Sequence, residues 1–139
     1  MSNRSVAVAA CALTCCSLHA AGSRWTSVSP DVLKDNRTGL QWTRADNGSE
    51  INWADAQAYC MRLKQRWRLP DVDELSAVAD ETKPFKLTGE WFWSATPAGN
   101  EFFDAPELAL GVSFANGVRT ASLRVVGYGS RALCVRSKP

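Results

Sequence analysis

Thiols and imidazoles are the side chains best suited to nucleophilic, redox and metal chemistry near neutral pH. This 139-residue sequence contains five cysteines and one histidine. Only Cys60 and Cys134 lie beyond the N-terminal segment, whereas the others fall within residues 1–22: Cys11, Cys15, Cys16 and His19. The chemistry open to the protein therefore depends on whether this N-terminal segment is kept.

Residues 1–22 have the layout of a secretory signal peptide. Arg4 gives a basic start, residues 6–18 form an almost unbroken apolar or small-residue run, and small residues follow it. The run is shorter than the roughly 20 apolar residues of a membrane-spanning helix. A lipidation box ending at Cys11 is disfavoured, because only about five core residues precede it where about 7 to 15 are usual. A buried N-terminal helix is the other alternative. We predict a periplasmic or secreted protein with one mature domain, residues 23–139.

Removal of this segment leaves two cysteines and no histidine. In an oxidising compartment the simplest outcome is a Cys60–Cys134 disulfide, with two separate buried thiols as the alternative. Without imidazole or free thiolate, Ser-His-Asp and Cys-His triads and histidine–cysteine zinc sites are excluded. We therefore predict a non-enzymatic domain without a cofactor or metal. Carboxylate, lysine or tyrosine chemistry stays open in principle.

The charge of the mature domain is nearly balanced. Loss of Arg4 leaves fifteen basic and fourteen acidic residues, a net charge of +1. This balance gives no electrostatic reason to expect binding to nucleic acid or to a membrane surface. All six tryptophans lie in the mature domain, where such aromatic density helps to build a small core.

Two helices are expected between β-hairpins. Asn52 is a good N-cap, Asp55 can close a capping box, and an apolar stripe follows at spacings of three and four, with residues 64–66 in the last turn. The stripe consists of Trp53, Ala56, Cys60, Leu63 and Trp67. A second helix begins at Asp71, with Glu74 at the box position. Its buried face consists of Val72, Leu75, Val78 and Ala79.

The remaining segments read as strands and turns. Asn36–Gly39 and Asn116-Gly117 are turn signals between apolar runs, and each indicates a hairpin. Further strands are expected at residues 24–28, 91–96, 123–126 and 133–136, and loops at 80–90 and 97–108. The predicted fold is therefore α+β, with two helices packed on an antiparallel sheet built mostly from hairpins.

Five motifs occur in a fixed order along the mature chain. They are Thr38-Gly39-Leu40-x-Trp42, Trp53-x-x-Ala56-x-x-x-Cys60, Trp67-Arg68-Leu69-Pro70-x-x-x-Glu74-Leu75, Trp93-Ser94-x-Thr96 and Cys134-Val135-Arg136. Their order and spacing resemble the domain of unknown function at the C-terminus of the Legionella collagen-like adhesin. The resemblance covers nearly the whole mature chain. One departure is the short segment before Trp67, which lacks the glycine expected there.

This resemblance implies a C-type-lectin-like fold and a bacterial surface or periplasmic location. It supports the Cys60–Cys134 pairing and implies no catalytic activity. In the adhesin the domain is linked to oligomerisation and to binding of sulfated polysaccharide. The near-neutral charge of the present chain does not by itself favour that ligand.

Structural and functional interpretations compete for the charged residues of the third motif. Arg68 could contact an anion or sugar, but an ion pair with Glu74 is favoured. Trp53, Trp67 and Pro70 are likewise expected to stabilise the fold and not to bind a ligand. Asp71, Asp73 and Glu74 could bind calcium, although their place at a helix start already explains them. A glycosidase-like carboxylate pair drawn from Glu101, Asp104 and Glu107 is an alternative that the sequence cannot place in a cleft.

Aromatic and basic residues are the candidates for partner contacts. Trp91 and Trp93 would share one face of a strand, which is either exposed for docking or buried on both sides, the favoured interpretation. Phe102 and Phe103 lie in the predicted long loop, and Arg119 could join Arg124 and Arg131 in a basic stripe. We expect a non-catalytic module that binds a glycan or protein at the cell envelope, with oligomerisation possible. An immunity or inhibitor protein against a secreted toxin, and a structural envelope component, are the alternatives.

Overall fold

The computed structural model describes residues 22–100 and 103–137. These residues form two helices and eight strands in the order β1 (Trp25–Ser29), β2 (Val32–Asp35), β3 (Gln41–Thr43), α1 (Trp53–Arg62), α2 (Val72–Val78), β4 (Trp91–Asn100), β5 (Phe103–Ser113), β6 (Arg119–Leu123), β7 (Ser130–Arg131) and β8 (Val135–Arg136). The predicted α+β class is confirmed. The predicted signal peptide lies outside the described residues apart from Gly22, so it stays a prediction.

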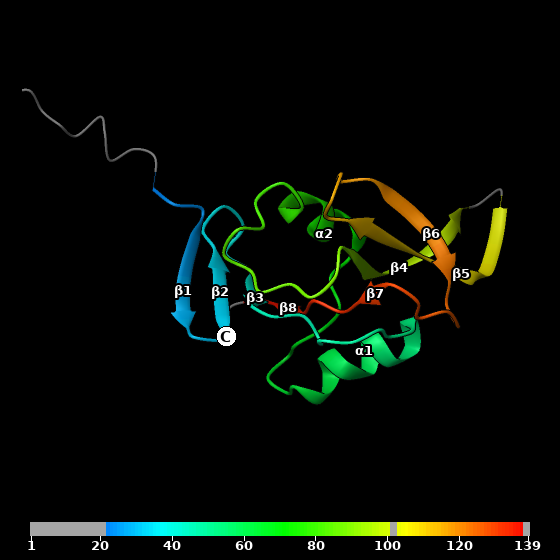
Figure 1. The fold of residues 1–139 in the computed structure, drawn as a ribbon, viewed down its shortest axis with the longest axis horizontal. Coiled ribbons are helices and arrows are strands. Elements are labelled where there is room, and N and C mark those ends of the chain that lie inside the picture. The colour runs from blue at the N-terminus through cyan, green and yellow to red at the C-terminus, as the bar shows by residue number, and fades with distance from the viewer. Residues whose placement is uncertain (1–21, 101–102, 138–139) are drawn as a thin grey trace, which may run out of the picture.

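Two four-stranded sheets replace the single sheet that we expected. The strand orders are β1-β2-β3-β8 and β6-β5-β4-β7, and the β4–β7 pair is parallel. Figure 1 shows the two sheets following one another along the long axis, with α1 and α2 on opposite sides. Both predicted hairpins are present, as β2–β3 and β5–β6. The predicted strand over residues 123–126 is wrong after Leu123, because the chain turns there.

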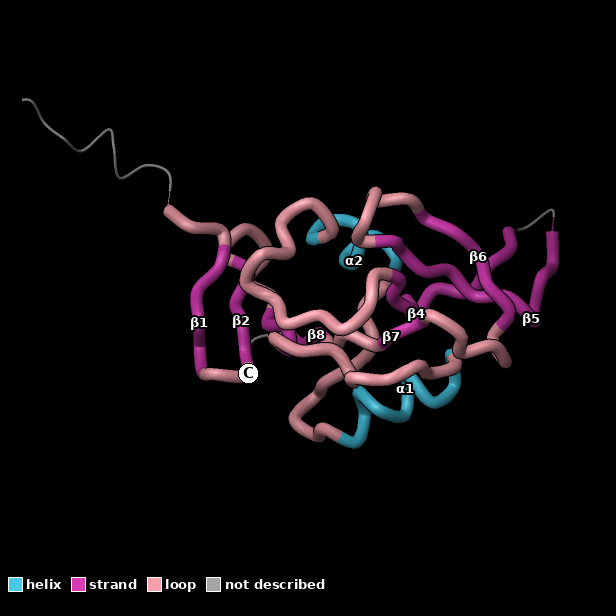
Figure 2. The backbone as a smooth tube through the Cα atoms, viewed as in Figure 1, coloured by secondary structure: helices cyan, strands magenta, loops and turns pink. Residues whose placement is uncertain are grey.

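The predicted loop over residues 97–108 is also wrong. β4 and β5 continue as a paired hairpin to Asn100 and Phe103, with register shifts between Trp93 and Pro97 and between Pro97 and Gly99. Pro97 and Gly99 lie within β4 without ending it, and both residue types are common at bulges. The hairpin therefore reaches well beyond the core, as the tube in Figure 2 shows.

Helix α1 begins where the sequence predicted and ends earlier. The Asn52 side chain accepts a hydrogen bond of 2.9 Å from the Asp55 N–H, so the cap is confirmed. The helix ends at Arg62, so the prediction that residues 64–66 form its last turn is wrong. They have positive φ values of 62°, 52° and 66°, and Leu63 is exposed. Three successive non-glycine residues in this region are strained, at about 1–2 kcal/mol each. They occupy the place where the family resemblance led us to expect glycine.

Helix α2 confirms its predicted cap. Asp71 accepts from the Glu74 N–H at 2.7 Å, and the Glu74 carboxylate accepts from the Asp71 N–H at 2.9 Å. This reciprocal capping box satisfies two N–H groups that a helix start otherwise leaves free. The buried face of α2 lies on the predicted residues Val72, Leu75 and Val78.

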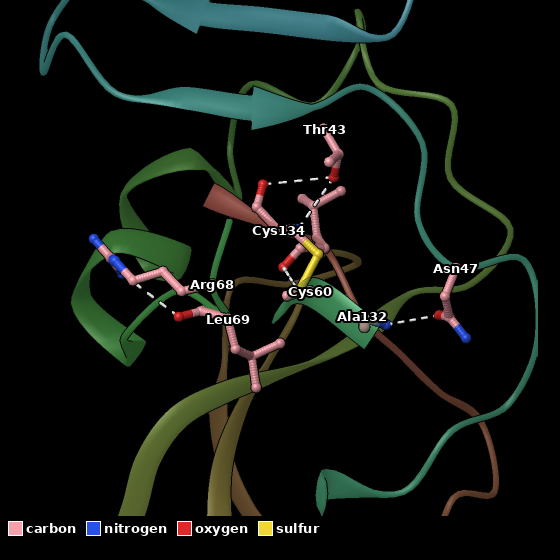
Figure 3. Close-up of a disulfide and its surroundings, with 8 residues drawn as sticks. Thr43, Asn47, Cys60, Arg68, Leu69, Ala132 and Cys134 are labelled. Atoms are coloured by element: carbon pink, nitrogen blue, oxygen red, sulfur yellow. Dashed lines mark hydrogen bonds between the residues drawn. A yellow bond between two sulfur atoms is a disulfide. The ribbon is translucent and has the colours of Figure 1, made fainter. Parts of the chain in front are cut away.

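The predicted disulfide is present and joins the end of α1 to the segment just before β8. The Cys60 and Cys134 Cα atoms are 5.5 Å apart across a sequence separation of 74 residues. Both cysteines are fully buried, next to Trp67, Leu69 and Trp93 in one core cluster. Figure 3 shows the bridge between Cys60 and Cys134. A second cluster, which includes Trp42, Leu75 and Phe92, lies on the α2 side. No helix within the described residues is long and apolar enough to cross a membrane.

Candidate functional site

Exposed large apolar side chains are concentrated in one stretch of the chain. Among the described residues, five of the eight exposed large hydrophobic side chains fall between residues 118 and 128. They are Val118, Leu123, Val125, Val126 and Tyr128. Val125 is 83% exposed and Tyr128 is 86% exposed. We call residues 118–128 the β6 surface, since they comprise β6 and the turn that follows it.

The turn after β6 is held firmly from beneath by Arg124. Its guanidinium lies 4.2 Å from the centre of the Trp53 ring, and its Nε donates to the Leu108 carbonyl at 3.0 Å. Its own carbonyl accepts from the Trp53 N–H at 3.1 Å. Arg124 therefore joins the turn to α1. It does not form the basic stripe with Arg119 and Arg131 that the sequence suggested.

Close backbone packing adds to this anchorage. A Cβ atom at Gly127 would lie 2.9 Å from the Ile51 carbonyl carbon, so only glycine lets the turn approach so closely. The Gly129 N–H donates to the Glu50 carboxylate at 3.2 Å, and the Ile51 N–H donates to the Ser130 carbonyl at 3.2 Å. Because its backbone is fixed on both sides, the turn presents Val125 and Tyr128 to solvent in a defined position.

β6 is also an open sheet edge. It is the outermost strand of its sheet and pairs only with β5 among the described residues. The Arg124 N–H donates to the Glu107 carbonyl at 2.8 Å, in register with the Leu108–Leu123 pair. Because hydrogen-bonded pairs alternate in an antiparallel ladder, the N–H groups of Arg119, Ala121 and Leu123 face outward. The edge thus combines free backbone donors with exposed apolar side chains.

Trp91 supports the β6 surface from within the sheet. Its ring lies across Gly111, where an added Cβ would come within 2.2 Å of the ring. Its Nε1–H donates to the Thr120 hydroxyl at 2.8 Å. Trp91 is half-buried, so it braces β6 and offers only part of its ring to solvent.

A partner contact through Trp93 is contradicted by its burial. The side chain is 0% exposed, its Nε1–H donates to the Ile51 carbonyl at 2.8 Å, and its ring packs edge-on against Trp91 at 4.7 Å. Phe92 on the opposite face is fully buried too. The interpretation of this strand as buried on both sides is the one that the structure supports.

The remaining predicted contact residues have different places. Arg119 is exposed, but its guanidinium forms an ion pair with Asp73 at 2.7 Å and donates to the Ser76 hydroxyl at 2.8 Å. It therefore links β6 to α2. Phe102 lies outside the described residues, and Phe103 begins β5 at the far end of the hairpin. A contact through these two phenylalanines stays a prediction.

Arg68 and Glu74 form the ion pair that the sequence favoured. The two guanidinium nitrogens of Arg68 donate to the two Glu74 oxygens at 2.7 and 2.9 Å. This pairing is the main cause that lowers the pKa of Glu74 below its ordinary value of 4.5, and the Asp71 N–H lowers it further. With Asp71 as a cap and Glu74 occupied, these carboxylates serve the fold.

Other buried carboxylates are occupied in the same way. Asp46 accepts from the Thr88 N–H and hydroxyl at 2.6 and 2.7 Å and from the Gly48 N–H at 2.8 Å. Asp35 accepts two hydrogen bonds from Arg24 at 3.0 and 2.9 Å. Burial raises the pKa of Asp35, but these bonds and the Arg37 N–H outweigh burial and lower it overall. Across residues 22–100 and 103–137, no three histidine, cysteine or acidic side chains gather as metal ligands would.

The comparison with protein families follows the same residues. The profile of the Lcl C-terminal domain matches residues 31–136, from the turn before β2 to the end of β8. The chain belongs to this family. The matched range contains both helices, the disulfide and the whole β6 surface. The resemblance drawn from the five motifs is therefore confirmed.

Solved structures similar to this Lcl C-terminal domain show the fold. Botrocetin matches with a TM-score of 0.52 and 13% identity, covering 85% of this chain and 98% of that one. EMS16, an antagonist of the collagen receptor integrin α2β1, matches with a TM-score of 0.52 and 11% identity, covering 85% and 100%. The C-type-lectin-like fold is thereby shown. A search of curated proteins gave no match.

Sequence reasoning missed the β6 surface of this family member. The segment Leu123–Val126 is apolar except for Arg124 and resembles a strand, and nothing in its composition shows that its apolar side chains face solvent. The available signal was the pair Gly127 and Gly129, because closely spaced glycines after an apolar run indicate a turn.

Proposed function

We propose that this chain is an exported, non-catalytic binding module whose β6 surface contacts a protein partner at the bacterial envelope. The observation that carries the proposal is the concentration of exposed apolar side chains on an anchored turn beside an open strand edge. Exposed apolar patches on soluble domains usually mark interaction sites, and a fixed loop loses little entropy on binding.

A protein partner fits this surface better than a glycan does. Val125, Val126 and Leu123 are aliphatic, and aliphatic side chains reward the burial of other apolar groups. Sugar recognition instead needs polar groups that match hydroxyls. Tyr128 adds a rigid aromatic side chain with a polar tip, a residue type that is frequent at the energetic centre of protein interfaces.

A non-catalytic role agrees with the placement of the reactive side chains. Cys60 and Cys134 are joined to one another, and the buried carboxylates at Asp35 and Asp46 each accept structural hydrogen bonds. EMS16 has the same fold and is an antagonist of a receptor, which supports binding as the function of this chain.

Site-specific photo-crosslinking in the native host tests the proposal. A benzophenone amino acid replaces Tyr128, or Val28 as a matched exposed position on β1. We expect a discrete protein adduct from position 128 only. With the crosslinker kept at 128, a Val125→Ser change should reduce the adduct at least about tenfold, as for a hot-spot residue. Equal adducts from both positions, or none from position 128, would refute the proposed surface.

Export needs its own measurement. Periplasmic and culture fractions should contain a chain whose intact mass begins after residue 20 or 22 and lacks two hydrogens, as a single disulfide requires. A full-length chain confined to the cytoplasm would contradict export without affecting the β6 surface.

A further inference from the structure

A second exposed segment has a different composition from the β6 surface. Every residue from Met61 to Arg66 is exposed, and the cations Arg62, Lys64 and Arg66 are interspersed with the apolar Met61 and Leu63 and the polar Gln65. Met61 is 68% exposed and Leu63 is 39% exposed. From residue 56 to residue 70 the sequence contains no acidic residue. We call residues 61–66 the basic tip.

The backbone of the basic tip holds these side chains outward. After α1 ends at Arg62, residues 64–66 turn with positive φ, and the Trp67 N–H donates to the Lys64 carbonyl at 3.1 Å. Figure 2 shows the tip as the loop that leaves the end of α1 and projects from the lower edge of the molecule. Its N-terminal side is fixed by the disulfide at Cys60.

A fourth cation completes the basic tip from another part of the chain. The Arg136 guanidinium stacks at 4.3 Å on the Trp67 ring and donates to the Gln41 and Gln65 side-chain oxygens, each at 2.9 Å. Gln65, Arg66, Arg136 and Ser137 line a hollow of about 390 Å³. Neither side-chain partner of Arg136 is acidic, so none of the residues that the structure describes compensates its positive charge.

Nearby acids are engaged elsewhere. Arg68, the next cation along the chain, pairs with Glu74, and Asp71 caps α2 across a small hollow from Met61. The positive charge of Arg62, Lys64 and Arg66 therefore has no acidic partner among the described residues. The basic tip is thus a strongly positive part of the surface, although the net charge of the whole chain is near zero.

We propose that the basic tip docks the domain on an anionic lipid bilayer. Cations attract acidic headgroups, and Met61 and Leu63 can enter the boundary between headgroups and acyl chains, as the apolar side chains of interfacial segments do. The presence of Met61 and Leu63 among the cations favours a membrane over an anionic polysaccharide, because a polysaccharide gives no apolar environment to either side chain. On the β6 surface the cations are engaged, Arg119 with Asp73 and Arg124 with the Trp53 ring and the Leu108 carbonyl, so the two sites differ in character.

Vesicle sedimentation of the mature, disulfide-bonded chain tests the proposal. The probes are vesicles of phosphatidylcholine alone and of phosphatidylcholine with about one-third phosphatidylglycerol. We expect binding only to the anionic vesicles and a strong decrease with added salt. Each Lys or Arg near an anionic surface contributes about fivefold in partitioning, so Lys64→Gln/Arg66→Gln should lose about twenty- to thirtyfold. The matched control Lys83→Gln/Lys86→Gln neutralises two exposed lysines elsewhere and should bind nearly as the parent does.

The apolar half of the basic tip separates membrane from polysaccharide. Met61→Ser/Leu63→Ser should lose vesicle binding several-fold while its melting temperature stays within a few degrees of the parent's, since both positions are at the surface. Full retention of vesicle binding by this variant, with equal binding of heparin by parent and variant, would show a general polyanion site and overturn the membrane proposal. Absence of binding to anionic vesicles, or equal binding to neutral ones, would overturn it as well. Tyr128→Ser should leave vesicle binding intact, which distinguishes this site from the β6 surface.

Discussion

Arg68 and Glu74 are joined by two hydrogen bonds, and Glu74 at the same time accepts from the Asp71 backbone that begins α2. The Glu74 carboxylate thus holds Arg68, the Asp71 cap and the first turn of α2 together. This double use explains why arginine and glutamate occur six residues apart in the third motif. Their role is to join the segment that follows the basic tip to α2.

Removal of the Glu74 charge should destabilise the fold. Glu74→Gln keeps an acceptor for the Asp71 N–H but loses the bidentate pair, so we expect a loss of about 1–2 kcal/mol in the free energy of unfolding. Urea unfolding followed by tryptophan fluorescence measures it. The control Asp73→Asn breaks the exposed pair with Arg119 and should cost less than about 0.5 kcal/mol. Equal losses in both variants would contradict the assigned role.

Acid should weaken the fold through Asp35 and Glu74. Both carboxyls have lowered pKa values in the folded state, so their stabilisation is fully present above their ordinary values of 3.8 and 4.5. It is lost as the pH falls through the lower folded values. The free energy of unfolding should be level from about pH 5 to 7 and should fall below about pH 4.5. In Glu74→Gln the fall should be shallower. An unchanged slope in that variant would show that Glu74 contributes little to it.

The disulfide should contribute strongly to stability. It closes a loop of 74 residues in sequence separation, for which the chain-entropy relation gives about 4 kcal/mol. Cys60→Ala/Cys134→Ala should therefore unfold at much lower denaturant, and dithiothreitol should lower the stability of the parent by a similar amount. The double variant should not respond to dithiothreitol. Stability that is insensitive to reduction would contradict a structural role for the bridge.

Glycine should relieve the strained backbone of the basic tip. At Lys64, where φ is 62°, Lys64→Gly should raise the free energy of unfolding by up to about 1 kcal/mol, because glycine avoids the cost of a left-handed conformation. Arg62→Gly serves as the control. Arg62 is the last residue of α1, where glycine should instead cost up to about 1 kcal/mol. If both variants lose stability, the positive φ of Lys64 is not a source of strain.

The features predicted correctly from the sequence depend on local signals or on simple elimination. The caps at Asn52 and Asp71 involve partners three residues away, so a short window of sequence contains the whole motif. The disulfide followed because an expected signal peptide left only Cys60 and Cys134 to pair. The Arg68–Glu74 pair also depends on a local pattern, because each residue lies three positions from the Asp71 cap.

The errors arose where distant parts of the chain decide. Lys64, Gln65 and Arg66 are good helix formers, but Arg136 from the C-terminal strand holds Gln65 and stacks on Trp67, and the helix ends early. The hairpin beyond residue 97 is held by strand pairing that Pro97 obscures. The β6 surface depends on the packing of Arg124 against Trp53 and of Gly127 against Ile51; the glycines signal a turn, but nothing local shows where that turn packs.

The Cys60–Cys134 bridge has a further consequence for the response of the protein to proteases. Both the open edge of β6 and the turn after it lie between the two bridged cysteines in sequence, and Arg119 on this stretch is an exposed residue of the type after which trypsin-like proteases cut. A single cut there leaves the two fragments covalently connected. The nicked protein should therefore migrate as one species on a non-reducing gel and as two after reduction, and it can keep its shape in a protease-rich environment.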